Sequence, residues 1–318
     1  MITTDINKAK EILLKNELIA IPTETVYGLA GNAYNETALK EIFKLKNRPF
    51  YNPLIVHLKS ASCITDVATE IPESALILAE KFWPGPLTLV LKKQPHISDI
   101  VTAGKETVAV RVPKHPLALA LLDKLDFPLA APSANPFGSI SPTNAEHVFN
   151  YFGEKLKVIL DGGECEKGLE STIIGFENNQ PILYRHGSIS LEEIEKITGK
   201  LSIITNSEKT PNSPGMLSRH YAPKTDTYLT NTISELLNCF KGKKIGILVF
   251  KNPFQDKRIV QEEILSKAGD FNEAAKNLYA AMHRLDQNNL DVIIAERLPD
   301  VGLGKTINDK LERATKKV

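Results

Sequence analysis

The chain has 318 residues, which indicates about two domains at roughly 150 residues per domain. Lys and Arg number 39 and Asp and Glu 38, so the formal net charge of +1 excludes a protein that covers nucleic acid or anionic lipid with a basic surface. Hydrophobic residues make up 42% and charged residues 24%, and this ordinary globular composition excludes wholesale disorder.

The three cysteines, Cys63, Cys165 and Cys239, are far apart in the chain and odd in number. They therefore predict neither a disulfide framework nor a Cys-rich zinc site, and they fit a reducing compartment. Residues 1–17 form a charged amphipathic stretch, and no apolar run reaches the roughly 18 residues of a membrane span. We expect a soluble cytoplasmic protein that does not contact a membrane.

Helix and strand patterns alternate along the first 190 residues, which predicts an α/β domain. Helices are expected over 6–17, 36–46, 74–82, 116–125 and 144–152, and strands over 18–21, 54–58, 87–91, 107–112, 129–131, 158–160, 172–176 and 182–185.

A capping box, Ser190 with Glu193, then begins a short helix that Gly199 ends. The next residues, 202–224, have no periodicity and predict a linker. Further elements are expected near Thr227 and over 233–240, 245–250, 272–285 and 292–295, with a basic helix at the end. These patterns predict a domain over 1–200, a linker over 201–224 and a smaller α/β domain over 225–318.

Polar side chains follow several of the predicted strands. In PTETVYGLAG (22–31) a strand ends in polar residues and a glycine turn, and the spacing alone fits a turn with a helix cap as well as a ligand site. The segment KLKNRPFYNPLIVH places Lys46, Arg48 and Asn52 on a loop before a strand that carries His57. This loop is either a solvated helix cap or a phosphate site.

Arg111 stands between valines in an alternating strand, on the face that it shares with the small residues Thr107 and Ala109. A guanidinium above small side chains has room to bind a carboxylate or phosphate with two parallel hydrogen bonds. The alternative is an arginine on an edge strand that faces water.

Further strand ends carry hydroxyl or cationic groups: LAAPSAN with Ala131 and Ser133, GLESTIIG with Ser171, and YRHG with Arg185. A tight turn would explain the first of these equally well, but several such strand ends together favour a ligand site, because ligands of open α/β sheets bind beyond the ends of strands. The segment GLGKT (302–306) lacks the first glycine and the preceding strand of a phosphate-binding loop. Neither a metal-ligand histidine spacing nor a GxSxG turn is present.

The ordered set PTETVYGL, KLKNRP, NPLIVH, WPGPLTLVL, VAVRVP, APSAN, ESTI and YRHG resembles the YrdC-type domain of L-threonylcarbamoyladenylate synthases. SPGMLSRHYAP and the final GLGKTINDKLERA resemble the two-domain form of that family. The resemblance implies a twisted mixed α/β sheet with helices, whose concave face holds both substrates. It also implies a smaller Rossmann-like domain, joined by a linker that covers the site as a lid.

The resemblance implies a nucleotidyltransferase that condenses L-threonine, bicarbonate or CO₂ and ATP into L-threonylcarbamoyl-AMP and pyrophosphate. A partner transferase would then modify an adenosine beside the anticodon of tRNA. Mg²⁺ would enter with ATP, and no metal ligand is assigned to the chain. The implied threonine-binding residues are Thr25, His57, Arg111, Ala131 and Ser171; the ATP-binding residues are Arg48, Asn52, Thr107, Ser133, Ser141, Arg185 and Tyr221; and the catalytic residues are Lys46 and Arg48.

Two other functions stay open. One is a non-catalytic RNA-binding module; the near-neutral charge speaks against it, although the basic end of the chain leaves room for a weak RNA contact, through Lys305, Lys310, Arg313, Lys316 and Lys317. The other is a related carbamoyl-transfer enzyme that takes carbamoyl phosphate. The absence of zinc-finger and acylphosphatase-like segments, together with SPGMLSRHYAP, favours threonine.

Overall fold

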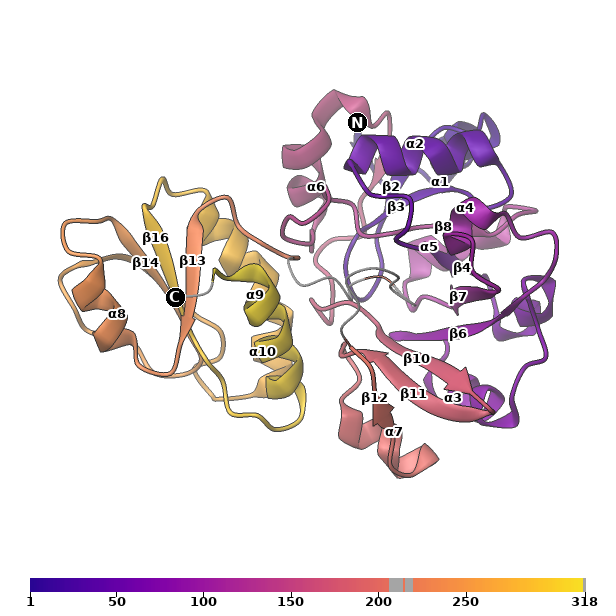
Figure 1. Cartoon of the computed structure of the whole chain (residues 1–318). Helices are drawn as coiled ribbons and strands as arrows, with labels where there is room; N and C mark the ends of the chain where they lie inside the picture. Colours follow the sequence, from indigo (N-terminus) through magenta and orange to yellow (C-terminus); the bar gives the residue numbers. More distant parts are fainter. Residues whose placement is uncertain (206–213, 215–219, 317–318) are drawn as a thin grey trace.

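Two β-sheets organise the chain, each covered by its own helices (Figure 1). The structure is a computed structural model that describes residues 1–205, 214 and 220–316. Most of the predicted lid segment 213–223 lies outside the described residues, and so does Lys317. None of the helices in the described part has the length and apolar character that crossing a membrane requires.

The large sheet is mixed and twisted, and it is built from the first 203 residues. Its strands follow one another in space as β1 (Ile2–Thr3), β9 (Ile159–Leu160), β2 (Ile19–Ile21), β3 (Gly28–Asn32), β8 (Leu129–Ala130), β4 (Ile55–His57), β7 (Thr107–Arg111), β6 (Leu87–Lys93), β10 (Thr172–Glu177), β11 (Gln180–Arg185) and β12 (Ser202–Ile203), with β5 (Ala68–Thr69) paired to β6. Strand β7 pairs in parallel with β4 and antiparallel with β6, so it lies inside the sheet.

Helices connect these strands, as the alternating sequence pattern predicts. They are α1 (Ile6–Leu14), α2 (Glu36–Lys46), α3 (Glu73–Phe82), α4 (Asp99–Thr102), α5 (Pro116–Asp123), α6 (Ala145–Phe152) and α7 (Leu191–Thr198), with short 3₁₀ turns at Ala61–Asp66 and Gly153–Lys155. The Asn35 side chain caps α2, and the predicted Ser190–Glu193 capping box begins α7, with Gly199 at its end.

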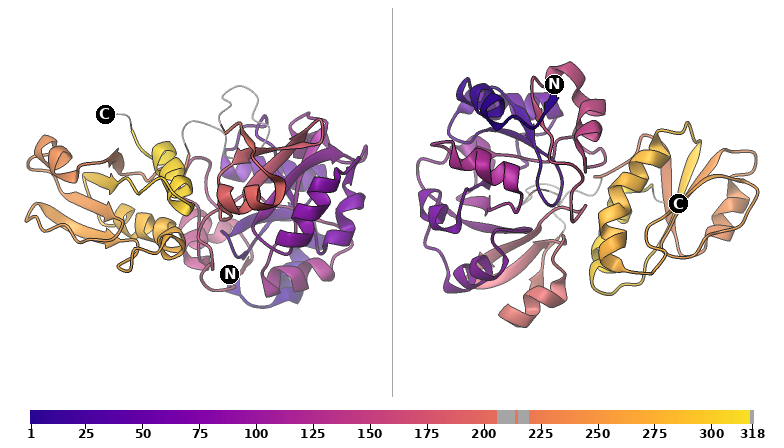
Figure 2. Two further views of the ribbon diagram at one scale, coloured as in Figure 1. Left: turned by 90° about the horizontal axis from the view of Figure 1, so that it is seen from below. Right: turned by 180° about the vertical axis from the view of Figure 1, so that it is seen from behind.

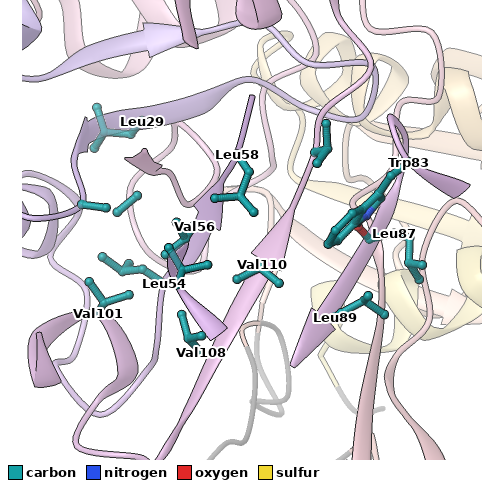
Figure 3. Close-up of a cluster of buried hydrophobic side chains, with 14 of the residues drawn as sticks. Leu29, Leu54, Val56, Leu58, Trp83, Leu87, Leu89, Val101, Val108 and Val110 are labelled. Atoms are coloured by element: carbon teal, nitrogen blue, oxygen red, sulfur yellow. The ribbon is translucent and has the colours of Figure 1, made fainter. Parts of the chain in front are cut away.

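The alternation of β7 separates a core from a ligand-accessible face. Val108, Val110 and Val112 belong to the main hydrophobic cluster. Figure 3 shows part of this cluster, with side chains from β4, β6, β7 and α4. Ala109 packs on the opposite face with Ile55 and other residues of a smaller cluster. Since Arg111 shares this second face, it can reach a cavity without displacing the core.

The second sheet is parallel and carries helices on both sides (Figure 2). Its order is β13 (Asp226–Thr230), β16 (Val292–Glu296), β14 (Ile245–Val249) and β15 (Ile259–Ile264). Helix α8 (Ile233–Cys239) packs on one face, and α9 (Phe271–Asp286) and α10 (Leu303–Ala314) pack on the other. Helices α9 and α10 lie between this sheet and the first domain.

Several elements differ from the sequence-based expectation, which does not include α4 or the short strands β1 and β5. Residues 22–31 were open to interpretation as a turn and helix cap, but β3 follows the turn, so the helix-cap alternative is wrong. Strand β12 lies inside the predicted linker and pairs with β11. Strand β15 has a polar sequence, and it forms because it is the edge strand beside β14.

Candidate active site

A cavity at the ends of the central strands contains most of the predicted site residues. Its empty space, open mouth included, is about 560 Å³. The lining residues are Thr23, Thr25, Val26, Tyr27, Gly28, Arg48, Ile55, His57, Arg111, Ala131, Pro132, Ser133, Glu170, Ser171, Arg185, Pro214, His220 and Tyr221. All five predicted threonine-binding residues are among them.

Arg111 is buried at the end of β7, where its register partner on β4 is His57. Its Nη2 lies 2.7 Å from Oε1 of the buried Glu24, and its Nε donates to the Gly85 carbonyl at 3.2 Å. The other Glu24 oxygen accepts from the Lys114 amide at 2.9 Å. The edge-strand alternative for Arg111 is therefore wrong, and Glu24 fixes the guanidinium at the cavity wall.

The His57 ring is buried in the cavity wall, and its Nδ1 lies 3.3 Å from the Ile55 carbonyl. Burial, with the nearby charge of Arg111, lowers the pKa of His57 to about 3. The imidazole is therefore neutral at physiological pH, so it can bind a substrate by hydrogen bonding without adding a second positive charge beside Arg111.

The turn after β2 is held by its own threonines. The Thr23 hydroxyl donates to the Val26 carbonyl at 2.7 Å and lies 2.8 Å from the hydroxyl of Thr25. The Val26 amide donates back to Thr23 Oγ1 at 3.2 Å. This closed set of hydrogen bonds fixes Thr25 at the cavity wall.

Two more arginines supply positive charge to the cavity. Nη2 of Arg48 donates to the Asn52 side chain and to the Pro53 carbonyl, both at 2.7 Å. Nη2 of Arg185 donates to the carbonyl and hydroxyl of Ser171, at 2.9 and 3.0 Å. Burial and the charge of Arg185 lower the pKa of Arg48 to about 9, which still leaves it charged at neutral pH. The solvated-cap alternative for this loop is wrong, because Arg48 and Asn52 are buried.

Lys46, predicted to be catalytic, is almost completely buried beneath the cavity and does not line it. Its ammonium donates to the backbone carbonyls of Ser133 at 2.5 Å and of Asn135. Desolvation, followed by the charge of Arg48, lowers its pKa well below the ordinary value. In this structure Lys46 holds the 133–135 loop in place, and its catalytic role stays a prediction.

Three predicted ATP-binding residues also lie outside the cavity lining. Asn52 contacts the cavity through Arg48, and the Ser141 hydroxyl donates to Glu170 at 2.6 Å. Thr107 lies at the start of β7, opposite Lys92, and its four-residue separation from Arg111 spans roughly 13 Å along the strand. Its predicted contact with ATP is not supported by this placement.

Tyr221, the predicted lid residue, is buried in the cavity wall with a φ of 64°. Its hydroxyl has no hydrogen-bond partner among the described residues. The adjacent His220 ring lies 4.2 Å from the Tyr221 ring, and burial lowers the pKa of His220 well below its ordinary value. A buried, unpartnered hydroxyl at a cavity is a group that a ligand can satisfy.

The sequence analysis missed three buried residues of the site: Glu24, Glu170 and His220. The two acids belong to PTETVYGL and ESTI, but no spacing rule shows that they pair with cations or hydroxyls from distant strands. His220 lies in the predicted linker, where the sequence has no periodicity.

The described residues offer few side chains that could hold a metal ion. No group of three His, Cys, Asp or Glu side chains suited to a metal occurs within residues 1–205, 214 and 220–316. Glu170 is the acidic residue of the cavity lining, and both of its oxygens already accept hydrogen bonds. This donor set fits a Mg²⁺ ion that is carried by substrate phosphates and water.

The basic side chains of residues 305–316 are paired with acidic side chains or backbone carbonyls of the protein. Lys310 is buried and donates to the His186 carbonyl at 2.8 Å, and Arg313 donates to Asp309. Lys305 pairs with Glu192 and Lys316 with Asp226. These four side chains therefore do not form an unpaired basic surface for RNA.

The twisted α/β sheet and the cavity lined by arginines and hydroxyls define an enzyme that binds anionic small molecules at its strand ends. The Sua5/yciO/yrdC family model, described as "Telomere recombination", matches residues 11–187, and the model described as "Threonylcarbamoyl-AMP synthase, C-terminal domain" matches residues 189–315. The chain therefore belongs to the threonylcarbamoyl-AMP synthase family.

Relatives match nearly the whole chain. The threonylcarbamoyl-AMP synthase of Pyrococcus abyssi is 41% identical over 96% of this chain and 93% of its own, and that of Bacillus subtilis is 40% identical over 97% and 92%. The crystal structure of P. abyssi Sua5 complexed with L-threonine superposes with a TM-score of 0.91, at 42% identity, and covers 98% of this chain and 94% of that one.

Proposed function

We propose that the protein condenses L-threonine, bicarbonate or CO₂ and ATP into L-threonylcarbamoyl-AMP and pyrophosphate. The observation that carries this proposal is the cavity, which Arg111 and His57 line together with Arg48 and Arg185. Together they match an amino-acid carboxylate and a nucleotide triphosphate, the two anionic groups of the substrates. Family membership over the full chain supports the same reaction.

Arg111 would bind the threonine carboxylate, and Thr25, His57 and Ser171 would hold its amine and hydroxyl. The neutral amine attacks CO₂, which forms the N–C bond of a carbamate and releases a proton; with bicarbonate, water is released instead. A neutral His57 suits this step because it can hydrogen-bond to the substrate without adding a second positive charge beside Arg111.

A carbamate oxygen then attacks the α-phosphorus of ATP, an O–P bond forms, and the bond to the β-phosphate breaks to release pyrophosphate. This displacement needs alignment and charge neutralisation more than a covalent nucleophile. Arg48 and Arg185 would bind the phosphates, and the unpartnered Tyr221 hydroxyl would bind the nucleotide. Mg²⁺ bound to ATP would supply further neutralisation of the phosphate charge.

The product is a mixed anhydride, so a transferase must take its acyl group, and we propose that the acceptor is the tRNA adenosine beside the anticodon. The first step is tested by incubating the protein with ATP, bicarbonate and labelled threonine. Pyrophosphate release should depend on both threonine and bicarbonate, and the label should appear in a threonylcarbamoyl adenylate. Pyrophosphate release that does not depend on threonine would contradict the proposal.

A further inference from the structure

One face of α9, in the second domain, lies against the wall of the cavity in the first domain. Tyr279 and His283 are four residues apart, a spacing that places both buried side chains on one helix face. The Tyr279 hydroxyl donates to Glu170 Oε2 at 2.8 Å, and His283 Nε2 lies 3.2 Å from the Ser141 carbonyl. Both contacts join residues more than a hundred positions apart in the chain.

The backbone of α9 also approaches the loop that carries Glu170. Gly168 has a φ of 69°, and a Cβ atom at this position would lie 2.3 Å from the Lys276 carbonyl oxygen. Glycine therefore permits a contact that any other side chain would prevent. Leu169 and Ile140, the neighbours of Glu170 and Ser141, belong to one hydrophobic cluster with α9. Their burial keeps the helix docked at this place.

Glu170 links α9 to the cavity in which Arg185 would bind the phosphates of ATP. It is 5% exposed, and its two oxygens accept from the Ser141 hydroxyl at 2.6 Å and from Tyr279. Burial raises the pKa of Tyr279 well above its ordinary value, so the hydroxyl keeps the proton that it donates. A buried carboxylate without such donors would turn to other partners, and Arg185 lines the same cavity.

We propose that Tyr279 is a positioning residue of the ATP site, and that the second domain completes this site through the chain Tyr279–Glu170–Ser141. By holding Glu170 on Ser141, Tyr279 keeps a negative charge away from Arg185 and from the triphosphate that Arg185 would bind. The inference rests on the proposed synthase activity, in which Arg185 binds the phosphates of ATP.

The test compares Tyr279→Phe with Tyr228→Phe, a change in the same domain. Tyr228 lies on β13 and packs against Phe240, the residue that follows α8. Tyr279→Phe should raise the KM for ATP by about tenfold, the effect of one lost hydrogen bond to a charged acceptor, and change the KM for threonine by less than about twofold. Tyr228→Phe should change neither. Binding of a non-hydrolysable ATP analogue without threonine should weaken by the same factor in Tyr279→Phe.

A second variant separates positioning from simple packing. In Glu170→Gln the side chain carries no negative charge, so adding Tyr279→Phe to it should raise the KM for ATP by much less than it does in the native chain. Additive effects, parallel increases in both KM values, or an unchanged KM for ATP in Tyr279→Phe would overturn the inference. A wild-type protein without threonine-dependent turnover would instead overturn the proposed function.

Discussion

Arg111 carries a buried positive charge at the cavity wall, and its ion pair with Glu24 neutralises this charge. Removing the arginine altogether would leave Glu24 buried without its cation, which commonly costs about 3–5 kcal/mol of folding free energy. An alanine variant at this position therefore mixes loss of binding with loss of stability. A lysine keeps the charge and loses the planar, two-donor geometry.

Arg111→Lys should raise the KM for threonine by roughly 10- to 100-fold, because a charge-assisted hydrogen bond is worth about 1.5–3 kcal/mol. Its KM for ATP should stay within about twofold of the native value, because Arg48 and Arg185 remain in place. Steady-state pyrophosphate release with each substrate varied in turn measures both constants. A native KM for threonine in this variant would remove Arg111 from the carboxylate-binding role.

Strand alternation predicted which face Arg111 occupies, whereas the threonine-binding set as a whole came from the resemblance to the family and the side-chain contacts could not be predicted. Arg111 was predictable because alternation fixes which face of β7 it occupies. The inward orientation of Lys46 was not, because its carbonyl partners on the 133–135 loop are distant in sequence. The same holds for Glu24 and Glu170, whose partners come from other strands and from α9.

At the scale of elements, local signals predicted helices better than strands. Helix α2 has the predicted bounds 36–46, because both the Asn35 cap and the apolar periodicity are local features of the sequence. Strand β3 was missed because its sequence, GLAGN, has no β-branched residue and forms between β2 and β8. Tertiary pairing, rather than propensity, makes it a strand.

The capping box of α7 gives a prediction for one element. Ser190→Ala removes the acceptor for the Glu193 amide and should lower the free energy of unfolding by about 1 kcal/mol. Ser234→Ala, at an exposed position inside α8, is the control and should not destabilise the protein, since alanine favours helix. Urea unfolding followed by circular dichroism measures both, and equal effects would argue against the cap.

At the scale of the whole molecule, the two domains meet at a pair of stacked histidines. The rings of His147 on α6 and His283 on α9 lie 3.8 Å apart. Desolvation, with the neighbouring charge of the partner ring and of Arg284, lowers the pKa of His147 to about 3, and desolvation lowers that of His283 to about 4. Both are neutral in the folded protein at pH 5, where an unfolded histidine is protonated.

Stability should therefore fall as the pH drops from about 6.5 towards 4, because the unfolded chain binds protons that the folded chain does not. Each such histidine contributes up to about 1.4 kcal/mol per pH unit in this window. His147→Gln and His283→Gln should each flatten the decline in melting temperature measured between pH 7 and 4.5. A slope that neither substitution changes would contradict the assignment.

The docked second domain predicts what a shortened chain will lose. A fragment that ends at Thr205 keeps every strand of the large sheet, including β12, so we expect it to fold. It loses the Tyr279 donor to Glu170 and the apolar cover that α9 gives Leu169 and Ile140. Its threonine-dependent turnover should fall more than about tenfold, mainly through a higher KM for ATP, which corresponds to at least about 1.4 kcal/mol. Circular dichroism checks that the fragment is folded. If a folded fragment kept native turnover, the first domain would form the ATP site alone.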